Sequence, residues 1–556
     1  MALAGEVNNF SGIIGFVPAR ARLSELPKQT TKDPPEFKRL QHFPKETEKL
    51  TLKKTYERER QRQLIIPLPD SEPQDTLHLA STGLGFSSPP LLPGLVSQIR
   101  ELLGNRARPT PVQTLSLTHF FRDGDVRGVS DGTLLAAETG SGKSLAYLLP
   151  VVQALKAGEN STTDPGNLAS PRALILVPTH ELARQVKSTL SHLTHAPDTK
   201  LRTVCVSTGS ANSLSRDGPQ STLLPSGDGG EFHISPPEQT KYSPDVVVGT
   251  PAKILDLTHP GGRYSVGPMR PTYEDKVKRE FERDVKMGYG RIEWVVVDEA
   301  DVLFDPDFAL WTEAILSDIP KPYNLVLATA TISAHLSKYL SAHHPTLTRL
   351  TTPQLHRLPA SLQTEYVEWD RRPGNRNPMV LKKLKDTWAE EARQHPGWKE
   401  RSKVIIFCNR SGKVKELGEY LRGEGIKCVS LTSDSENRQR GSNKHISAFL
   451  KPLPSANRKQ IVDLKPEDSA DVLVTTSLLS RGLDFTPAVR SVFIVDEPRN
   501  EVDFIHRAGR AGRAGRAGKV VVFTDGRGRG EIFRKRIQGG ERKTAGVRKI
   551  SAFDAA

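Results

Sequence analysis

The chain has few cysteines and no long apolar run, and each shortage argues against a class of protein. Only three cysteines occur in 556 residues, and no two of them form a CxxC pair. A disulfide framework is therefore excluded, a structural zinc site is disfavoured and a reducing compartment is favoured. No run of 18 apolar residues occurs, so we expect no membrane span. The most apolar stretch, LAYLLPVVQAL, contains Pro150 and predicts a buried helix.

Acidic residues are also in deficit. The formal net charge is +15, and an excess of Lys and Arg is typical of a polyanion partner, because neutralised phosphates release counterions. A merely soluble basic protein remains the alternative at this stage. Residues 1–24 contain one acid, Glu6, together with Arg20 and Arg22. This composition is typical of a weak mitochondrial presequence and equally of an ordinary disordered arm.

Short apolar runs that end in small or polar residues dominate the middle of the chain. They form two series: ALILVP, TVCVS, DVVVGT, WVVVDEA and NLVLATA, then KVIIFCN, KCVSLT, DVLVTT, SVFIVD and KVVVFTD. Buried parallel strands in two α/β domains have this pattern. The expected organisation is a disordered basic region at 1–79, a first domain at 80–360 with loop insertions at about 211–243 and 258–290, a linker at 361–380, a second domain at 381–525 and a basic tail at 526–556.

One motif predicts a phosphate-binding loop. AETGSGKS follows the apolar segment TLLAA and precedes an apolar helix, which is the context that such a loop needs. Gly140 and Gly142 would let backbone N–H groups close on phosphates at the helix N-terminus. Lys143 would reach the β- and γ-phosphates, and Ser144 would hold Mg²⁺. The first glycine of the general pattern is Ala137 here. The competing interpretation, a Gly/Ser turn, is disfavoured by the strand and helix around it.

A second motif, WVVVDEAD, places carboxylates at the tip of a predicted strand. Asp298 could hold Mg²⁺, through water, and Glu299 could orient or deprotonate an attacking water. The alternative is a pair of carboxylates that cap a helix N-terminus. The phosphate loop upstream favours the catalytic interpretation.

The stretch FIHRAGRAGRAGRAGK repeats arginine at every third position. It is either a disordered Gly/Arg coat for nucleic acid or a folded strip that aims arginines at a phosphate. It lies between the predicted strands SVFIVD and KVVVFTD, which favours the folded strip. Arginine suits that role because its planar fork stays charged and can engage phosphate oxygens bidentately.

These motifs together resemble the DEAD-box ATP-dependent RNA helicases over about residues 85–525, and in particular their divergent fungal mitochondrial branch. The resemblance implies two tandem RecA-like domains with parallel sheets, flanked by disordered basic tails. It implies ATP and Mg²⁺ as cofactors and hydrolysis on RNA binding that unwinds or remodels short RNA duplexes or RNA–protein complexes. It further implies a monomer without a membrane partner, acting in mitochondrial RNA or ribosome maturation with ribonucleoprotein components, with the nucleus or cytoplasm as alternative locations.

The resemblance also assigns residues to sites. In the family's pattern the nucleotide is bound by Phe86, Gln113, Ala137, Glu138, Thr139, Gly140, Ser141, Gly142, Lys143, Ser144 and Asp484. RNA is bound by Pro178, Thr179, Arg184, Gly209, Thr250, Pro251, Arg410, Thr475 and Arg481. Catalysis falls to Lys143, Asp298, Glu299, His506, Arg510 and Arg513, with the two arginines acting as fingers on the γ-phosphate and Ser144 and Asp298 as metal ligands.

Several positions depart from the family's pattern, nearly all of them in RNA-contacting or coupling segments. They include His180, Ser210, Lys253, Thr329 and Ser477. ATP hydrolysis is thus the firmer expectation, and an ATP-dependent RNA clamp that does not unwind stays open as an alternative. A non-catalytic RNA-binding protein is a further alternative, although the retained nucleotide motifs argue against it. A GTPase is disfavoured because no Asn-Lys-x-Asp segment occurs, and the sequence does not name the RNA.

Overall fold

The computed structural model describes most of the two predicted domains. The described residues are 85–87, 91–122, 125–126, 132–158, 170–206, 243–259, 287–352, 355, 361–369, 376–397, 401–432, 443–451, 470–499, 501–512 and 517–524. The predicted tails at 1–79 and 526–556 and almost all of both predicted insertions lie outside them. No helix in these described ranges is both long and apolar enough to cross a membrane.

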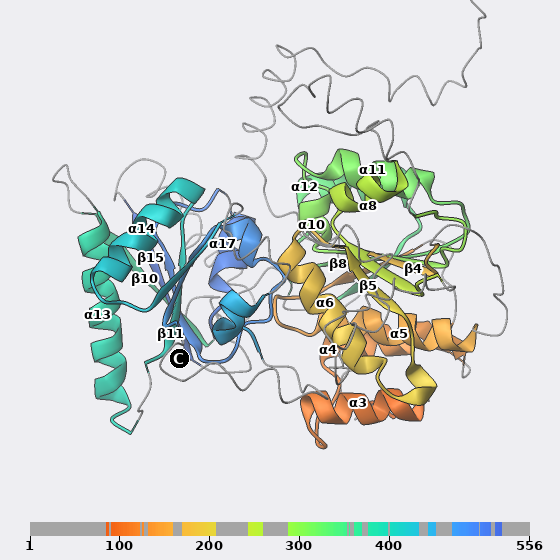
Figure 1. The fold of residues 1–556 in the computed structure, drawn as a ribbon, viewed down its shortest axis with the longest axis horizontal. Coiled ribbons are helices and arrows are strands. Elements are labelled where there is room, and N and C mark those ends of the chain that lie inside the picture. The colour runs from red at the N-terminus through yellow and green to blue at the C-terminus, as the bar shows by residue number, and fades with distance from the viewer. Residues whose placement is uncertain are drawn as a thin grey trace, which may run out of the picture. The chain divides into compact units, whose positions relative to one another are not determined.

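The first domain is built on a seven-stranded parallel sheet with the order β5-β6-β4-β7-β8-β3-β9 (Figure 1). Its strands are β3 (Thr133–Ala136), β4 (Ala173–Leu176), β5 (Thr203–Val206), β6 (Val246–Gly249), β7 (Trp294–Asp298), β8 (Asn324–Thr329) and β9 (Thr348–Thr351). A short antiparallel pair, β1 (Phe121–Arg122) and β2 (Asp125–Val126), stands apart from it. All five apolar runs predicted as strands in this half of the chain are strands of the sheet.

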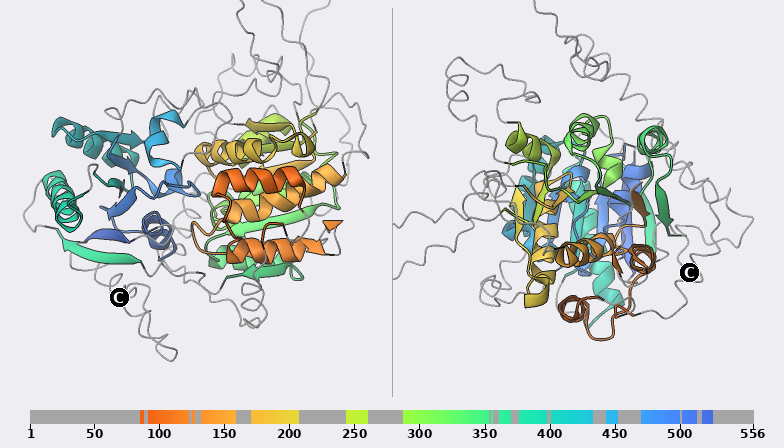
Figure 2. Two further views of the ribbon diagram at one scale, coloured as in Figure 1. Left: turned by 90° about the horizontal axis from the view of Figure 1, so that it is seen from below. Right: turned by 90° about the vertical axis from the view of Figure 1, so that its right-hand side faces the viewer.

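Helices cover both faces of this sheet, because successive strand residues point to opposite sides and both sides are apolar. Ile175 belongs to the core cluster on one face and its neighbour Leu174 to the cluster on the other. The first face carries α3 (Pro93–Leu103), α4 (Pro111–Phe120), α5 (Lys143–Ala157) and α6 (His180–Leu193), with the short η3 (Pro197–Thr199) (Figure 2). The second carries α8 (Pro251–Thr258), α10 (Ala300–Leu303), α11 (Ala309–Asp318) and α12 (Ala334–His343).

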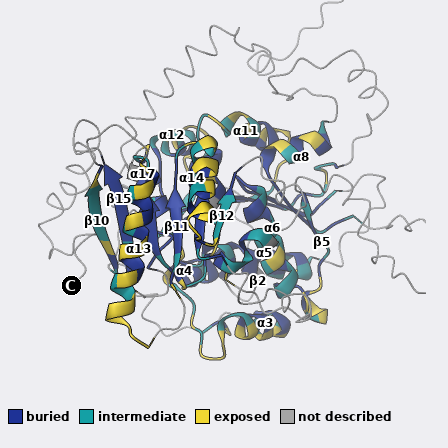
Figure 3. Cartoon of the chain, turned by 60° about the vertical axis from the view of Figure 1, so that its left-hand side comes forward, coloured by how far each residue is buried: buried dark blue, intermediate teal, exposed yellow. Residues whose placement is uncertain are grey.

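The second domain has a six-stranded parallel sheet with the order β10-β15-β14-β11-β13-β12. Its strands are β10 (Leu362–Glu368), β11 (Lys403–Phe407), β12 (Cys428–Leu431), β13 (Val472–Thr475), β14 (Val489–Ile494) and β15 (Gly518–Thr524). One face packs on α13 (Asn377–Gln394) and α14 (Ser411–Gly423), the other on η4 (Lys444–Phe449), α16 (Ser477–Ser480) and α17 (Glu501–Ala508). Figure 3 shows β11 and β15 buried, β10 at the sheet edge only partly buried, and the outer sides of α13 and α14 exposed.

The predicted linker at 361–380 is wrong for most of its described residues. Residues 362–368 form β10, which pairs in register with β15, and α13 begins at Asn377. The strand is hard to recognise in the sequence because it lies at the edge of the sheet. An edge strand is covered less completely than a central one, and only the first of the seven residues of β10 is buried. Its sequence, LQTEYVE, is therefore mixed rather than apolar.

Candidate functional site

The predicted phosphate loop joins the end of β3 to the first residue of α5. Gly140 and Gly142 have φ angles of 80° and 91°, in the left-handed region that glycine adopts without strain. The Lys143 ammonium is buried, and its Nζ donates to the carbonyls of Ala137 and Glu138 at 2.8 and 3.0 Å. Burial lowers the pKa of Lys143, against the attraction of nearby carboxylates. The Lys143 ammonium is thus held by two backbone carbonyls of the loop itself.

Neighbouring side chains hold this loop from two directions. Gln113 Nε2 donates to the Gly142 carbonyl at 3.1 Å, and its Oε1 accepts from the Thr110 N–H at 2.9 Å. Glu138 Oε2 accepts from the Thr352 hydroxyl at 2.8 Å. The amide of Gln113, predicted to contact adenine, therefore lies directly against the phosphate loop. Phe86, predicted to stack on the base, is 6% exposed and belongs to the apolar core cluster of this face.

The acidic end of β7 lies beside the loop. Asp298 and Glu299 are both buried, and Glu299 adopts a φ of 53°, the only non-glycine residue with a positive φ in the described part of the chain. Asp298 Oδ1 accepts from the Glu299 N–H at 2.9 Å, and Oδ2 accepts from the Tyr147 hydroxyl at 2.8 Å. Burial, with repulsion from Glu299, raises the pKa of Asp298 to about 6. Because burial and Glu299 destabilise the negative charge of Asp298, a bound cation would stabilise its ionised form.

Asp301 connects this strand end to the predicted arginine strip. Its Oδ2 lies 3.0 Å from His506 Nε2 and accepts from the Thr331 hydroxyl at 2.9 Å, while Oδ1 accepts from the Thr329 hydroxyl at 3.1 Å. Thr331 Oγ1 is itself 3.1 Å from His506 Nε2. Burial opposes ionisation of Asp301, but attraction to His506 and these hydrogen bonds hold its pKa below the ordinary range. Four buried groups from three segments thus form one polar network.

The arginine strip is folded where the structure describes it, since His506 and Arg507 lie in the last turn of α17 and Arg510 follows. Arg510 is 1% exposed, and its guanidinium donates to the carbonyls of His506 and Leu483 at 2.9 and 3.2 Å. Its charge also acts on Lys143, whose pKa it lowers further. The Thr139 hydroxyl donates to the Gly509 carbonyl at 3.4 Å. The strip therefore meets the phosphate loop, while Arg513 lies outside the described residues.

Some buried polar atoms at this junction have no hydrogen-bond partner within the described residues. They are Ser141 Oγ in the loop, Glu299 Oε2 and His506 Nδ1. Glu299 Oε2 lies 3.9 Å from His506 Nδ1. Buried polar atoms normally have partners, so this arrangement fits a polar ligand between the loop and the strip. Hard oxygen donors, the Asp298 carboxylate and the Ser144 hydroxyl, are also what Mg²⁺ prefers.

The predicted RNA-binding residues occupy several environments. Thr179 caps α6 by accepting from the Leu182 N–H at 3.3 Å, and Thr250 and Pro251 begin α8. Arg410 is exposed, whereas Thr475 is fully buried at the end of β13. Arg481 Nη1 lies 4.0 Å from Asp301 Oδ2, beside the polar network. Pro178 is buried before α6, and Gly209 lies outside the described residues. Asp484, predicted to bind the nucleotide, is exposed.

The first half of α6 contacts the second domain through two amide side chains. Gln185 Nε2 donates to the Gly482 carbonyl at 3.3 Å, and its Oε1 accepts from the Asp484 N–H at 2.7 Å. Asn443 Nδ2 donates to the Glu181 carbonyl at 3.0 Å, and its Oδ1 accepts from Arg184 Nη1 at 3.1 Å. We call this set of contacts the α6 clasp. Arg184, predicted to contact RNA, takes part in it.

Four residues in these contacts were not predicted from the sequence. Asp301 completes the DEAD motif and could have been inferred from it. Gln185 ends the segment PTHELARQ, in which Pro178, Thr179 and Arg184 were predicted. Tyr147 and Asn443 carry no sequence signal, because one sits in an apolar run and the other in a polar stretch without periodicity.

Comparison with known proteins agrees with this geometry. Residues 110–339 match the family model described as DEAD/DEAH box helicase, and residues 389–515 match the helicase conserved C-terminal domain. The chain is 36% identical over 487 residues to the ATP-dependent RNA helicase MRH4, mitochondrial, of Cryptococcus neoformans, covering 77% of this chain and 81% of that one. It is 32% identical over 430 residues to the protein of the same name from Pyricularia oryzae, covering 68% of this chain and 57% of that one.

Solved structures share the fold. S. cerevisiae Dbp5 bound to RNA and ADP BeF3 matches with a TM-score of 0.55 at 21% identity, over 85% of this chain and 94% of that one. Mss116p bound to ssRNA and AMP-PNP matches with a TM-score of 0.55 at 18% identity, over 78% of this chain and 72% of that one. The two sheets, the junction between phosphate loop and arginine strip, and these relatives lead to one conclusion: this chain belongs to the DEAD/DEAH box helicase family.

Proposed function

We propose that this protein is an ATP-dependent RNA helicase that hydrolyses ATP on binding RNA and thereby unwinds or remodels short duplexes or RNA–protein complexes. The observation that carries the proposal is the buried network of Asp301, Thr331 and His506. It joins the acidic strand end, next to the phosphate loop, to the arginine strip of the other domain. The nucleotide site is therefore complete only when residues of both domains meet.

The phosphate loop is the proposed site for ATP. Backbone N–H groups at the N-terminus of α5 would bind the phosphates, and Lys143 would exchange its two carbonyl partners for phosphate oxygens. Arg510 would stabilise charge that develops on the γ-phosphate, and Arg513 is proposed for the same role from the sequence pattern. Phe86, Gln113 and Asp484 are proposed to bind the nucleoside. The charge of Arg510 already acts on Lys143 across the junction, which supports its role at the phosphates.

Ser144 and Asp298 are proposed to hold Mg²⁺, which when bound would neutralise charge on the β- and γ-phosphate oxygens. Glu299 is proposed as the group that orients and deprotonates the attacking water, because its Oε2 is buried and faces His506 Nδ1 without a hydrogen-bond partner among the described residues. His506 would keep Glu299 and the arginine strip in contact, and the positive φ of Glu299 turns the chain sharply where β7 ends.

RNA is the proposed second substrate, bound by the residues that the family pattern assigns across both domains. The relatives named MRH4 carry the words RNA helicase and mitochondrial in their names, and the formal net charge of +15 suits a polyanion. We also propose that the protein is located in mitochondria and acts as a monomer. Its proposed role is in the assembly of ribosomes or other ribonucleoproteins. The domain limits at 80–360 and 381–525 are proposed in the same way, with β10 added to the second domain.

The decisive experiment measures steady-state ATP hydrolysis with and without single-stranded RNA, for the wild type and for Glu299→Gln. The expected result is RNA-stimulated hydrolysis that falls by a factor of roughly 10² to 10⁴ in the variant, the usual contribution of a general base. Glu299→Gln keeps the size of the side chain and should still bind nucleotide. Hydrolysis that is absent in both proteins, with RNA still bound, would favour the non-catalytic RNA-binding protein.

An ATP-dependent RNA clamp is the second candidate function, favoured by the departures from the family pattern. His180, Lys253 and Ser477 all fall in segments assigned to RNA contact or coupling. A strand-displacement assay with a short duplex separates the two functions. ATP turnover with displacement supports the helicase, and turnover without displacement supports the clamp.

A further inference from the structure

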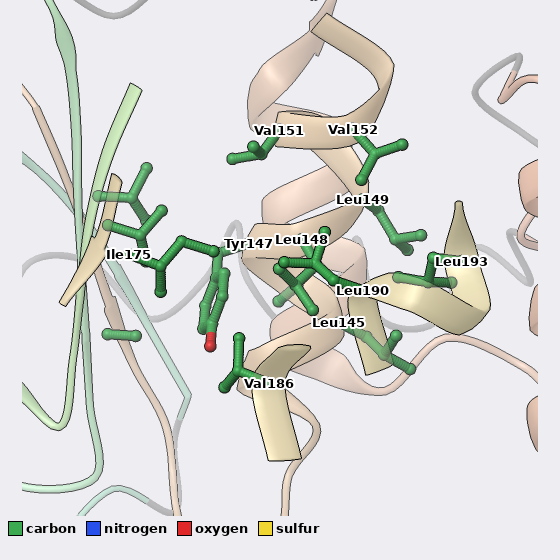
Figure 4. Close-up of a cluster of buried hydrophobic side chains, with 14 of the residues drawn as sticks. Leu145, Tyr147, Leu148, Leu149, Val151, Val152, Ile175, Val186, Leu190 and Leu193 are labelled. Carbon is green, nitrogen blue, oxygen red and sulfur yellow. The ribbon is translucent and has the colours of Figure 1, made fainter. Parts of the chain in front are cut away.

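Tyr147 is a buried polar residue that the proposed mechanism does not use. It is fully buried on α5, one helical turn beyond Lys143. Figure 4 shows its ring among the apolar side chains of the core, near Ile175 and Val186. A phenylalanine would fill this space equally well. Burial of a hydroxyl costs free energy unless it is hydrogen-bonded, so the bonds of the phenolic oxygen indicate what it does here.

The Tyr147 hydroxyl binds one of the two proposed metal ligands, because it donates to Asp298 Oδ2 at 2.8 Å. Ser144 precedes it by three residues, so both side chains share one face of α5. The other Asp298 oxygen accepts from the Glu299 N–H at 2.9 Å. The carboxylate is therefore held at both oxygens, and one of these bonds also links the helix of the phosphate loop to the acidic strand.

We propose that Tyr147 is a positioning residue for the divalent cation that accompanies the nucleotide. Its hydroxyl, on the helix that also carries Ser144, holds the Asp298 carboxylate in place before the cation arrives. Tyr147 acts through Asp298 and does not itself touch the cation. Residues that orient metal ligands in this way typically contribute a factor of about 10 to 100 in metal affinity. The inference rests on the proposed function, since it requires a nucleotide–cation site at Ser144 and Asp298.

The test is Tyr147→Phe in the full chain, which removes the hydroxyl and keeps the ring. Binding of a fluorescent ADP analogue is titrated in Mg²⁺ and in EDTA, and the ratio of the two affinities gives the magnesium coupling. We expect Tyr147→Phe to reduce this ratio about tenfold while the affinity in EDTA stays unchanged. Melting temperatures of both proteins check that the variant is folded.

Tyr323→Phe is the matched control. Tyr323 lies in the same domain, before β8, and its hydroxyl donates to the Leu316 carbonyl at 3.2 Å, away from the loop. Its loss should leave the magnesium coupling unchanged. A double-mutant cycle with Asp298→Asn adds a second readout, because Tyr147→Phe should have no further effect once the carboxylate is gone.

Two failures are distinguishable. A Tyr147→Phe variant with the wild-type magnesium coupling, or one whose effect is undiminished in the Asp298→Asn background, overturns the positioning role. A wild-type protein that binds the ADP analogue without any magnesium coupling contradicts the nucleotide–cation site itself, and with it that part of the proposed function.

Discussion

Arg507 shows how a single departure from the family pattern is accommodated at the level of one side chain. The family's pattern has aspartate where this chain has Ser477. Arg507 is 1% exposed, and its guanidinium donates to the Ser477 hydroxyl at 2.6 Å and to Asp503 Oδ2 and Asn409 Oδ1, each at 2.6 Å. Asp503 thus supplies a buried negative charge for the arginine. The carboxylate that faces Arg507 comes from α17, the helix that carries Arg507 itself.

Asp503→Asn tests this compensation. Removing one charge of a buried ion pair typically costs about 3 to 5 kcal/mol, because the other charge is left uncompensated. We expect a loss of this size at pH 7 in urea unfolding followed by circular dichroism. Ser477→Ala, which removes a neutral partner of the guanidinium, should cost less, about 2 kcal/mol, as is usual for a hydrogen bond to a charged group. Equal losses in the two variants would mean that Asp503 does not carry the compensating charge.

The pH dependence of the same comparison follows from the pKa of Asp503. Burial opposes its ionisation, but the charges of Arg507 and Arg481 hold its pKa well below the ordinary range. A carboxyl whose pKa is depressed on folding contributes stability above the unfolded pKa of about 4, and this stability is lost as the pH falls through the folded value. The difference between wild type and Asp503→Asn should therefore shrink between about pH 5 and the acid limit. A difference that is constant from pH 7 to pH 3 would contradict this.

At the scale of elements, the sequence predicts buried strands well and some edge strands poorly. All ten apolar runs are strands of the two sheets. Eight of them are interior strands, which are apolar because both of their faces are covered, while β5 and β12 lie at sheet edges. β9 and β10, each at a sheet edge, were missed, since half-exposed strands mix polar and apolar residues. In the site, the phosphate loop and the acidic strand end were predictable from spacing. Tyr147 and Asn443 were not, because their partners lie more than 150 residues away in the sequence.

The α6 clasp leads to a prediction about coupling between ATP and RNA. Its hydrogen bonds form only when α6 meets the segments around Asn443 and Gly482 of the other domain. A Gln185→Ala, Asn443→Ala double variant should therefore weaken RNA binding in the presence of an ATP analogue by about tenfold, or about 1.4 kcal/mol of coupling. RNA binding without nucleotide should change little. Fluorescence anisotropy with a labelled single strand, with and without AMP-PNP, measures both affinities.

Gln394→Ala, in the exposed last turn of α13, is the control for this experiment. A third variant, Gly482→Ala, tests the same contact sterically. Gly482 has a φ of 68°, and a Cβ there would overlap Leu182 of α6. It should weaken the coupling as the double variant does. Coupling that survives in both variants would show that the clasp does not stabilise the RNA-bound form.

At the scale of the whole molecule, the formal net charge of +15 favours binding to a polyanion such as RNA. RNA binding that neutralises phosphates releases counterions, so affinity falls with salt in proportion to the number of phosphates neutralised. Part of the positive charge lies in the predicted basic tail at 526–556, outside the described residues, where Arg527 and Arg529 alternate with glycine. This stretch, GRGRG, is the sequence's best candidate for a nucleic-acid-contacting tail, in contrast to the strip at His506–Arg510, which is folded into the site.

Replacing Arg527 and Arg529 with glutamine separates these two arginine-rich segments. If each arginine neutralises one phosphate, the slope of log affinity for single-stranded RNA against log salt should become shallower by about 1.4, or about 0.7 for each phosphate. The turnover number for ATP at saturating RNA should remain at the wild-type value, since neither residue belongs to the phosphate site. An unchanged slope would assign RNA binding to the two folded domains alone. A reduced turnover number at saturating RNA would instead mean that the tail acts on the proposed nucleotide site. The two arginine-rich segments would then not have separate roles.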